Sequence, residues 1–266
     1  MMRSLYSAIS GLKNHQVRMD VIGNNIANVN TTGYKRSRAT FATALSQTLK
    51  GASAPATNGG TNAIQVGLGA MLSSVDQIMT QGSSQSTGNP TDLMLQGPGF
   101  FVLQNGTQTV YSRAGGFILD SNGTLVDPAT GSTVLDTSNA PITIDPATYT
   151  SFSIDSTGVI TGVSAGTTTP IATIGIATFP NPAGLMNVGG SFYTESNNSG
   201  AAILGQAGDA AHAETLIIPN ALEMSNVDLS QEFTDMIVTQ RGFQANSRVI
   251  TVSDTLLQEL IDLKRS

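Results

Sequence analysis

The two ends of this chain carry long helical patterns, and the residues between them do not. Near the N-terminus, apolar or seam-compatible residues recur every three or four positions, a spacing typical of helices that pack along a seam. This first seam consists of Leu5, Ala8, Leu12, His15, Met19, Ile22, Ile26 and Val29. A terminal helix of this kind has little core of its own to cover it, which favours packing against another copy of the chain. The alternative is an ordinary helix buried within its own domain.

A second helical pattern runs from residue 229 to residue 264. Asp228, followed by Gln231, resembles a capping box and predicts the start of this helix. Its apolar residues form two stripes, one of Phe233, Ile237, Phe243, Ile250, Leu257 and Ile261 and another of Val249, Leu256, Leu260 and Leu263. A helix that is apolar on two flanks needs more than one partner.

The first helix is expected to stop within residues 28–32, where Asn and Thr side chains compete for backbone hydrogen bonds. Gly33 can then adopt the left-handed conformation that ends many helices. Residues 51–62 have linker composition. We therefore expect terminal helical segments at 1–33 and 226–266 and an extended connector at 34–70.

Residues 71–225 are rich in Gly, Thr and Ser and carry strand and turn signals. Three short apolar runs are each followed by a turn: Phe100–Leu103 before Asn105-Gly106, Gly116–Leu119 before Asn122-Gly123, and Ser151–Ile154 before Asp155–Gly158. Each predicts a β-hairpin. The expected fold class is α+β, with terminal helices in a coiled-coil-like bundle and a central, mainly β domain.

Composition excludes several classes of protein. The absence of cysteine rules out disulfides and thiolate metal sites. No apolar run is long enough for a cleaved signal peptide or a membrane-spanning helix, which predicts a chain without membrane insertion that is exported, if at all, by another route. Residues 1–50 carry seven Lys and Arg against Asp20 alone, while residues 51–229 carry twelve acids against Arg113 alone. Without aromatic stacking residues beside them, these basic residues favour docking on acidic faces of neighbouring copies over nucleic-acid binding.

Both terminal segments carry longer motifs. The N-terminal ones are Leu5-Tyr-Ser-Ala-Ile-Ser-Gly-Leu12, Asp20-Val-Ile-Gly-Asn-Asn-Ile-Ala-Asn28 and Thr32-Gly-Tyr-Lys35. The C-terminal ones are Ala221-Leu-Glu-Met-Ser-Asn-Val-Asp-Leu229 and Met236-Ile-Val-Thr-Gln-Arg-Gly-Phe-Gln-Ala-Asn246. Together they resemble the signatures of the bacterial flagellar rod and hook proteins. The middle adds Gly97-Pro-Gly-Phe-Phe101, Tyr111-Ser-Arg-Ala-Gly115, Asn122-Gly-Thr-Leu125 and Gly184-Leu-Met-Asn-Val-Gly189, so the resemblance covers nearly the whole chain.

The resemblance implies a structural subunit that polymerises into a helical tube, with its terminal helices inside and its β domain outside. It implies export through the flagellum's own secretion apparatus, without a cleaved signal peptide, to the basal body or hook. The implied partners are further copies of the chain and the flanking rod, hook-cap and hook–filament junction proteins. Within the family the motifs favour a hook subunit that transmits motor torque, with the distal rod protein as the alternative.

The residues expected at the assembly interface come from both helical patterns. They are Leu5, Leu12, Met19, Ile22, Ile26, Val29, Phe233, Ile237, Phe243, Ile250, Leu257 and Ile261. Beyond the first helix, Lys35, Arg36 and Arg38 are expected to contact an acidic patch of an adjacent subunit, with a solvated charge run as the alternative.

Two rival classes of function are an enzyme and a surface binding module. An enzyme would need His15 or His212, with Asp209 and Glu214 near the latter as possible metal ligands. Their spacing matches neither a zinc helix nor a calcium loop, and no phosphate loop or nucleophile elbow is present. A binding module would leave the two terminal seams without a role. We therefore predict no catalytic residue, no metal and no cofactor.

Overall fold

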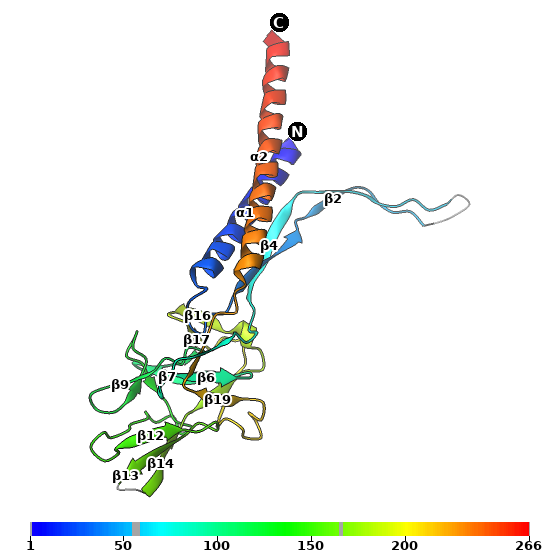
Figure 1. The fold of residues 1–266 in the computed structure, drawn as a ribbon. Coiled ribbons are helices and arrows are strands. Elements are labelled where there is room, and N and C mark those ends of the chain that lie inside the picture. The colour runs from blue at the N-terminus through cyan, green and yellow to red at the C-terminus, as the bar shows by residue number, and fades with distance from the viewer. Residues whose placement is uncertain (1, 55–58, 165–166, 266) are drawn as a thin grey trace. The chain divides into compact units, whose positions relative to one another are not determined.

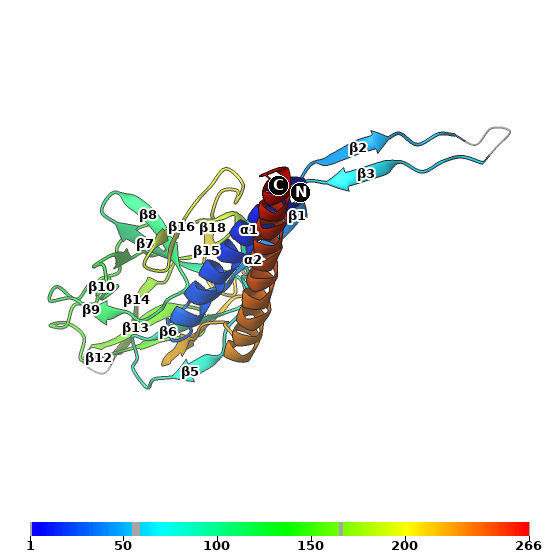
Figure 2. The ribbon, with the colours of Figure 1, turned by 90° about the horizontal axis from the view of Figure 1, so that it is seen from above.

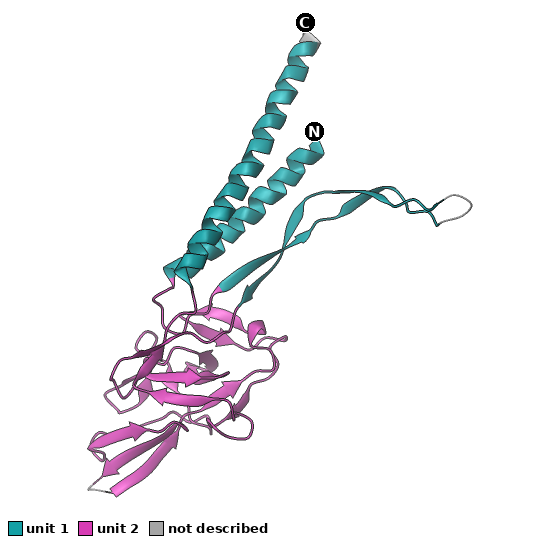
Figure 3. Cartoon of the chain, turned by 45° about the vertical axis from the view of Figure 1, so that its right-hand side comes forward, with its two compact units in different colours: residues 1–27, 37–77, 228–266 teal, residues 28–36, 78–227 magenta. Residues whose placement is uncertain are grey.

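The computed structural model describes residues 2–54, 59–164 and 167–265. Part of the predicted linker 51–62, residues 55–58, lies outside the described residues. Helices and many strands are both present, so the fold class is α+β (Figure 1). The chain divides into two compact units (Figure 3): the first comprises residues 1–27, 37–77 and 228–266, and the second comprises residues 28–36 and 78–227.

The first unit contains the helices α1 (Met2–Ala27) and α2 (Leu229–Arg265). The predicted start of α2 is confirmed, because the Asp228 carboxylate accepts a hydrogen bond from the Ser230 backbone N–H at 2.9 Å. Helix α1 ends earlier than the seam pattern predicts, so Val29 lies beyond it. Thr31 donates two hydrogen bonds to Asn28, from its backbone N–H to the carbonyl and from its hydroxyl to the side-chain amide oxygen. This local turn replaces the next helical turn.

Two pairs of antiparallel strands complete the first unit. Strand β1 (Ser37–Thr43) pairs with β4 (Ala70–Gln77), with a bulge between Thr40 and Phe41. Strand β2 (Ser46–Lys50) pairs with β3 (Ile64–Gly67), and together they form a two-stranded ribbon (Figure 2). Much of the segment expected to be an extended connector, residues 34–70, therefore consists of paired strands.

The described part of the second unit consists of short antiparallel strands and one 3₁₀ turn, Pro182–Gly184. Its largest sheet has the order β16-β17-β8-β7-β11-β10-β9, with β15 also bonded to β7 and β18 to β15. The smaller sheets are β12-β13-β14, β19-β6 and β20-β5. The strand bounds are β5 (Ser84–Ser86), β6 (Leu93–Gln96), β7 (Phe100–Asn105), β8 (Gln108–Ser112), β9 (Ile118–Leu119), β10 (Leu125–Val126), β11 (Thr133–Val134), β12 (Ser151–Ile154), β13 (Val159–Ser164), β14 (Thr167–Thr173), β15 (Ile176–Thr178), β16 (Met186–Gly189), β17 (Phe192–Thr194), β18 (Ile203–Gly205), β19 (Leu216–Pro219) and β20 (Ala221–Glu223).

The three predicted hairpins are confirmed. Strands β7 and β8, β9 and β10, and β12 and β13 are antiparallel pairs joined at the predicted turns. Gly106, Gly123 and Gly158 all have positive φ there, a conformation that glycine adopts without steric cost.

Strand β7 is the centre of the second unit's core because it is buried on both faces. Phe101 and Leu103 belong to one apolar cluster, while Phe100 and Val102 belong to another. The alternation follows from the two-residue period of a strand. In the second cluster the Phe179 ring lies edge-on to Phe100 and Tyr111, with centroids 5.8 Å and 4.9 Å away.

Candidate assembly surfaces

Helices α1 and α2 face each other through polar side chains. Arg18 pairs with Asp235 at 2.9 Å. Asn25 donates to the Glu232 carboxylate at 3.2 Å and also bonds to the backbone of Ser37, at the start of β1. Asn25 and Glu232 are 1% and 4% exposed. Buried polar contacts of this kind are costly to leave unpaired, so they favour one helix register.

Two glycines let the same helices approach closely. A Cβ atom on Gly11 of α1 would lie 2.7 Å from Nδ2 of Asn246, and one on Gly242 of α2 would lie 2.5 Å from Cε1 of His15. His15, expected on the first seam, thus packs against α2. Its Nδ1 is buried without a hydrogen-bond partner among the described residues. Burial, and secondarily the charge of Arg18, lowers the pKa of His15.

The seam of α1 is largely covered within the first unit, while much of α2 is not. Ile22 is buried, and Leu5, Leu12, Met19 and Ile26 are half-buried. On α2, Phe243, Ile250 and Leu257 are half-buried, whereas Phe233, Ile237 and Ile261 are 50%, 59% and 59% exposed. The second stripe of α2 is exposed throughout, at Val249, Leu256, Leu260 and Leu263. Contact of these residues with another copy stays a prediction.

The ribbon of β2 and β3 exposes further apolar side chains that sequence reasoning did not single out. Leu49 on β2 and Ile64 and Val66 on β3 are 57%, 53% and 37% exposed, and Leu45 beside β2 is 83% exposed. The linker composition of residues 51–62 favoured a connector over a strand pair in this part of the sequence. Ile64 and Val66 nevertheless alternate with other residues, as the residues on one face of a strand do.

A buried ion cluster in the second unit corrects the expectation for Lys35. Its Nζ lies 2.6 Å from Oε1 of Glu223 and donates to the Thr80 carbonyl at 2.9 Å. Arg113 pairs with the other carboxylate oxygen of Glu223 at 2.9 Å. The Lys35 and Glu223 side chains are 1% and 0% exposed, so Lys35 is occupied within its own chain and not displayed to a neighbour. Burial is also the main cause that lowers the pKa of Lys35.

The other two basic residues of that segment lie differently. Arg38, on β1, is exposed, and Arg36 is half-buried with its backbone N–H bonded to Asn226 at 2.8 Å. Contact of either side chain with an adjacent subunit stays a prediction.

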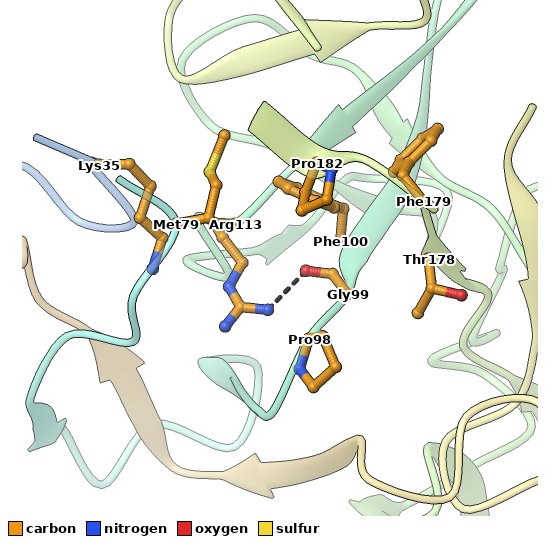
Figure 4. Close-up of a pocket in the computed structure, with 9 residues that line it drawn as sticks. All are labelled: Lys35, Met79, Pro98, Gly99, Phe100, Arg113, Thr178, Phe179 and Pro182. Carbon is orange, nitrogen blue, oxygen red and sulfur yellow. Dashed lines mark hydrogen bonds between the residues drawn. The ribbon is translucent and has the colours of Figure 1, made fainter. Parts of the chain in front are cut away.

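A small cavity of about 50 Å³ lies beside this ion cluster (Figure 4). Its lining residues are Lys35, Met79, Pro98, Gly99, Phe100, Arg113, Thr178, Phe179 and Pro182. Arg113 spans one side and donates to the Gly99 and Gly97 carbonyls at 2.5 Å and 2.8 Å. Small-molecule sites usually measure roughly 300–1,000 Å³, so we assign this cavity no ligand.

His212, the other histidine of the enzyme alternative, has a packing role in the second unit. It is 2% exposed, and its Nε2 lies 3.0 Å from the Ile203 carbonyl and 3.2 Å from the Thr178 hydroxyl. The ring fills the space over Gly205, where a Cβ atom would lie 2.6 Å away. Within the described residues no three His, Asp or Glu side chains are grouped as metal ligands. Neither described helix combines the length and apolar character needed to cross a membrane.

Family models match three segments of the chain. The model "Flagella basal body rod protein" matches residues 5–35, "Flagellar hook protein FlgE/F/G D1 domain" matches residues 94–162, and "Flagellar basal body rod FlgEFG protein C-terminal" matches residues 218–263. The first and last segments include most of α1 and α2, and the middle one includes β7.

Relatives of both kinds align over nearly the whole chain. The flagellar basal-body rod protein FlgG of Bacillus subtilis is 51% identical over 268 residues, covering 100% of each chain. The FlgG of Borreliella burgdorferi is 37% identical over 273 residues with the same coverage. The flagellar hook protein FlgE of Borreliella burgdorferi is 31% identical over 443 residues, covering 99% of this chain and 100% of its own. The chain therefore belongs to the family of flagellar basal-body rod and hook proteins.

Proposed function

We propose that this chain is a structural subunit of the distal rod of the bacterial flagellar basal body. The observation that carries the proposal is the end-to-end identity of 51% with a basal-body rod protein of nearly the same length. The motifs alone favoured a hook subunit, and that preference is corrected here. The hook relative is only 31% identical, and its alignment extends over 443 positions against 268 for the rod relative.

Self-assembly would use the apolar side chains that one copy leaves exposed. Phe233, Ile237 and Ile261 are each at least half exposed on α2. Removing such surface from water stabilises an assembly by about 25 cal/mol per Å². We infer that neighbouring copies cover these residues in a coiled-coil-like layer of terminal helices inside the tube, with the second unit outside it. Head-to-tail contacts that do not close would let the tube grow.

The same proposal implies where this chain is located and which proteins it contacts. Members of the family are parts of the flagellum, and family members assemble into polymers within its basal body. We infer that this chain passes through the flagellar export apparatus without a cleaved signal peptide. In the assembled structure it would adjoin further rod proteins and the hook. The hook-cap and hook–filament junction proteins, expected for a hook subunit, would lie farther along.

The proposal is tested by electron microscopy of purified protein induced to polymerise. A rod subunit should give straight tubes. Ile237→Glu with Phe233→Glu should abolish them, because two exposed apolar contacts become charged, while Gln240→Glu at an exposed polar position of the same helix should not. Curved tubes would contradict the rod assignment in favour of the hook. An intact chain that never polymerises, or tubes that both variants form equally well, would contradict the proposed role of α2.

A further inference from the structure

Helix α2 extends beyond the end of α1. The two helices are antiparallel, and the facing residues Gly11 and Asn246, like His15 and Gly242, have numbers that add to 257. Met2, where α1 begins, therefore lies level with about residue 255 of α2. Ser253 is accordingly the last buried residue of α2. Residues 256–265 form an overhang, visible as the red end of α2 in Figure 1, which is about 15 Å long at 1.5 Å per residue.

The overhang is apolar along one side and acidic beside it. Leu256, Leu260 and Ile261 are 45%, 51% and 59% exposed. Glu259 and Asp262 are exposed among them. The helix closes with Lys264 and Arg265. A solvated helix end would not need three large apolar side chains within six residues, so this segment has the composition of a contact surface.

A surface of matching chemistry lies at the same end of the first unit, on the first turns of α1. Met2, Tyr6 and Ile9 are 59%, 65% and 40% exposed, and their spacing of four and three residues places them on one face of α1. We name this the N-terminal face. Arg3 and Lys13 are exposed beside it, and no acidic residue occurs before Asp20.

We propose that the overhang of one copy packs on the N-terminal face of α1 in a second copy. Leu256 and Leu260 would cover Tyr6 and Ile9, and the acidic side chains of the overhang would lie near the basic residues of α1. The inference rests on the proposed function, because it assumes that copies of this chain assemble. It goes further by naming the two surfaces that meet.

The contact is between copies because one chain cannot make it alone. Helix α1 is continuous from Met2 to Ala27 and lies alongside α2 only up to about residue 255. Its N-terminal face therefore does not reach the overhang of its own chain. The contact proposed is head-to-tail, so that the docked copy presents its own overhang to a third copy, as growth of a tube requires.

Carboxylates lie beside the apolar side of the overhang, and basic residues lie beside the N-terminal face of α1. The overhang contributes Glu259 and Asp262. Helix α1 contributes Arg3 and Lys13. Such pairs add little affinity at an exposed site, but they discriminate between orientations.

Disulfide trapping tests the proposal, since the chain has no cysteine of its own. Tyr6→Cys is placed in one protein, and Leu260→Cys is placed in a second protein that carries a size tag. The two are mixed, polymerised, oxidised and separated on a non-reducing gel. The mixed, size-tagged dimer should be at least several-fold more abundant than in the control, where Leu216→Cys, in β19 of the second unit and 41% exposed, replaces Leu260→Cys. Ile9→Cys with Leu256→Cys tests the adjacent helical turn.

Microscopy of the same samples separates this inference from the proposed function. Tubes with no mixed dimer above the control, for either cysteine pair, would overturn the inference and leave self-assembly standing. Absence of tubes from the unmodified chain would overturn the proposed function itself. In a second test, Arg3→Glu with Lys13→Glu should reduce the mixed dimer several-fold at low salt, and Glu259→Lys with Asp262→Lys on the other protein should restore it. A yield unaffected by these reversals would contradict the charge pairing.

Discussion

Replacing Glu223 by Gln is expected to destabilise the second unit more than any change at the surface. The carboxylate is 0% exposed and is the shared partner of Lys35 and Arg113. It also accepts the Gly82 backbone N–H at 2.8 Å. Glu223→Gln leaves both cations buried without a carboxylate, and breaking a buried pair from one side typically costs about 3–5 kcal/mol.

Removing Lys35 should cost much less. Lys35→Met leaves Arg113 and Glu223 as a balanced pair and replaces a buried ammonium with an apolar chain of similar length. Replacements of this kind are often close to neutral, so we expect a loss of no more than about 2 kcal/mol. In the double variant the two losses should not add, with a coupling energy of about 1–3 kcal/mol, because both residues belong to one network.

Urea unfolding can follow each unit separately by circular dichroism. The chain has no tryptophan, and four of its five tyrosines, Tyr34, Tyr111, Tyr149 and Tyr193, lie in the second unit, so the near-ultraviolet tyrosine signal reports that unit. The far-ultraviolet helical signal at 222 nm reports the first unit, which contains α1 and α2. Glu214→Gln is the matched control because its side chain is exposed, and it should change the free energy of unfolding by less than about 0.5 kcal/mol.

Two results would refute this reasoning. If Glu223→Gln lowered the free energy of unfolding no more than the Glu214→Gln control, the buried cluster would not hold the second unit together. If Lys35→Met were as costly as Glu223→Gln, the excess positive charge left by removing the carboxylate would not be the cause of the loss.

Three further predictions concern the first unit and are measured by helicity at 222 nm. Burial, and secondarily the charge of Arg18, lowers the pKa of His15 from 6.5, so the folded chain binds fewer protons than the unfolded chain between the lowered pKa and 6.5. The stability of the helix pair should therefore rise with pH across that window, His15 should add no pH dependence below it, and His15→Gln should remove the rise. Gly242→Ala should cost about 1–3 kcal/mol because its Cβ meets the His15 ring, and an additional His15→Ala should recover most of the loss; no recovery would show that the ring is not the obstacle. Asp228→Ala should cost about 1 kcal/mol by removing the cap of α2, whereas Asp228→Ser should cost little; equal losses would contradict a capping role.

Several features of the structure follow from residues that are close together in the sequence. The three- and four-residue spacing of apolar side chains predicted both terminal helices, and Asp228 predicted where α2 starts. Asn105-Gly106, Asn122-Gly123 and Asp155–Gly158 predicted the three hairpins. Each prediction succeeded because backbone hydrogen bonding in helix starts and tight turns depends on side chains only a few residues away. The terminal motifs likewise indicated the family.

The surfaces that α1 and α2 present could not be assigned in the same way. The spacing of apolar residues showed that α2 has two apolar stripes, but it did not show that α1 lies against a largely polar face between them. That arrangement depends on Asn25 meeting Glu232, 207 positions away along the chain. The overhang is a further consequence, because its length depends on the register at which the two helices meet.

Lys35 shows most clearly what only the tertiary structure decided. In the sequence it stands in a basic run with Arg36 and Arg38, and such a run is expected to be solvated or to face another molecule. In the folded chain it is buried against Glu223, which is 188 positions away. The local sequence determined that Lys35 carries a charge. Whether that charge faces water or a buried carboxylate was decided by long-range packing, because the cost of burial is offset only when distant residues supply the partners.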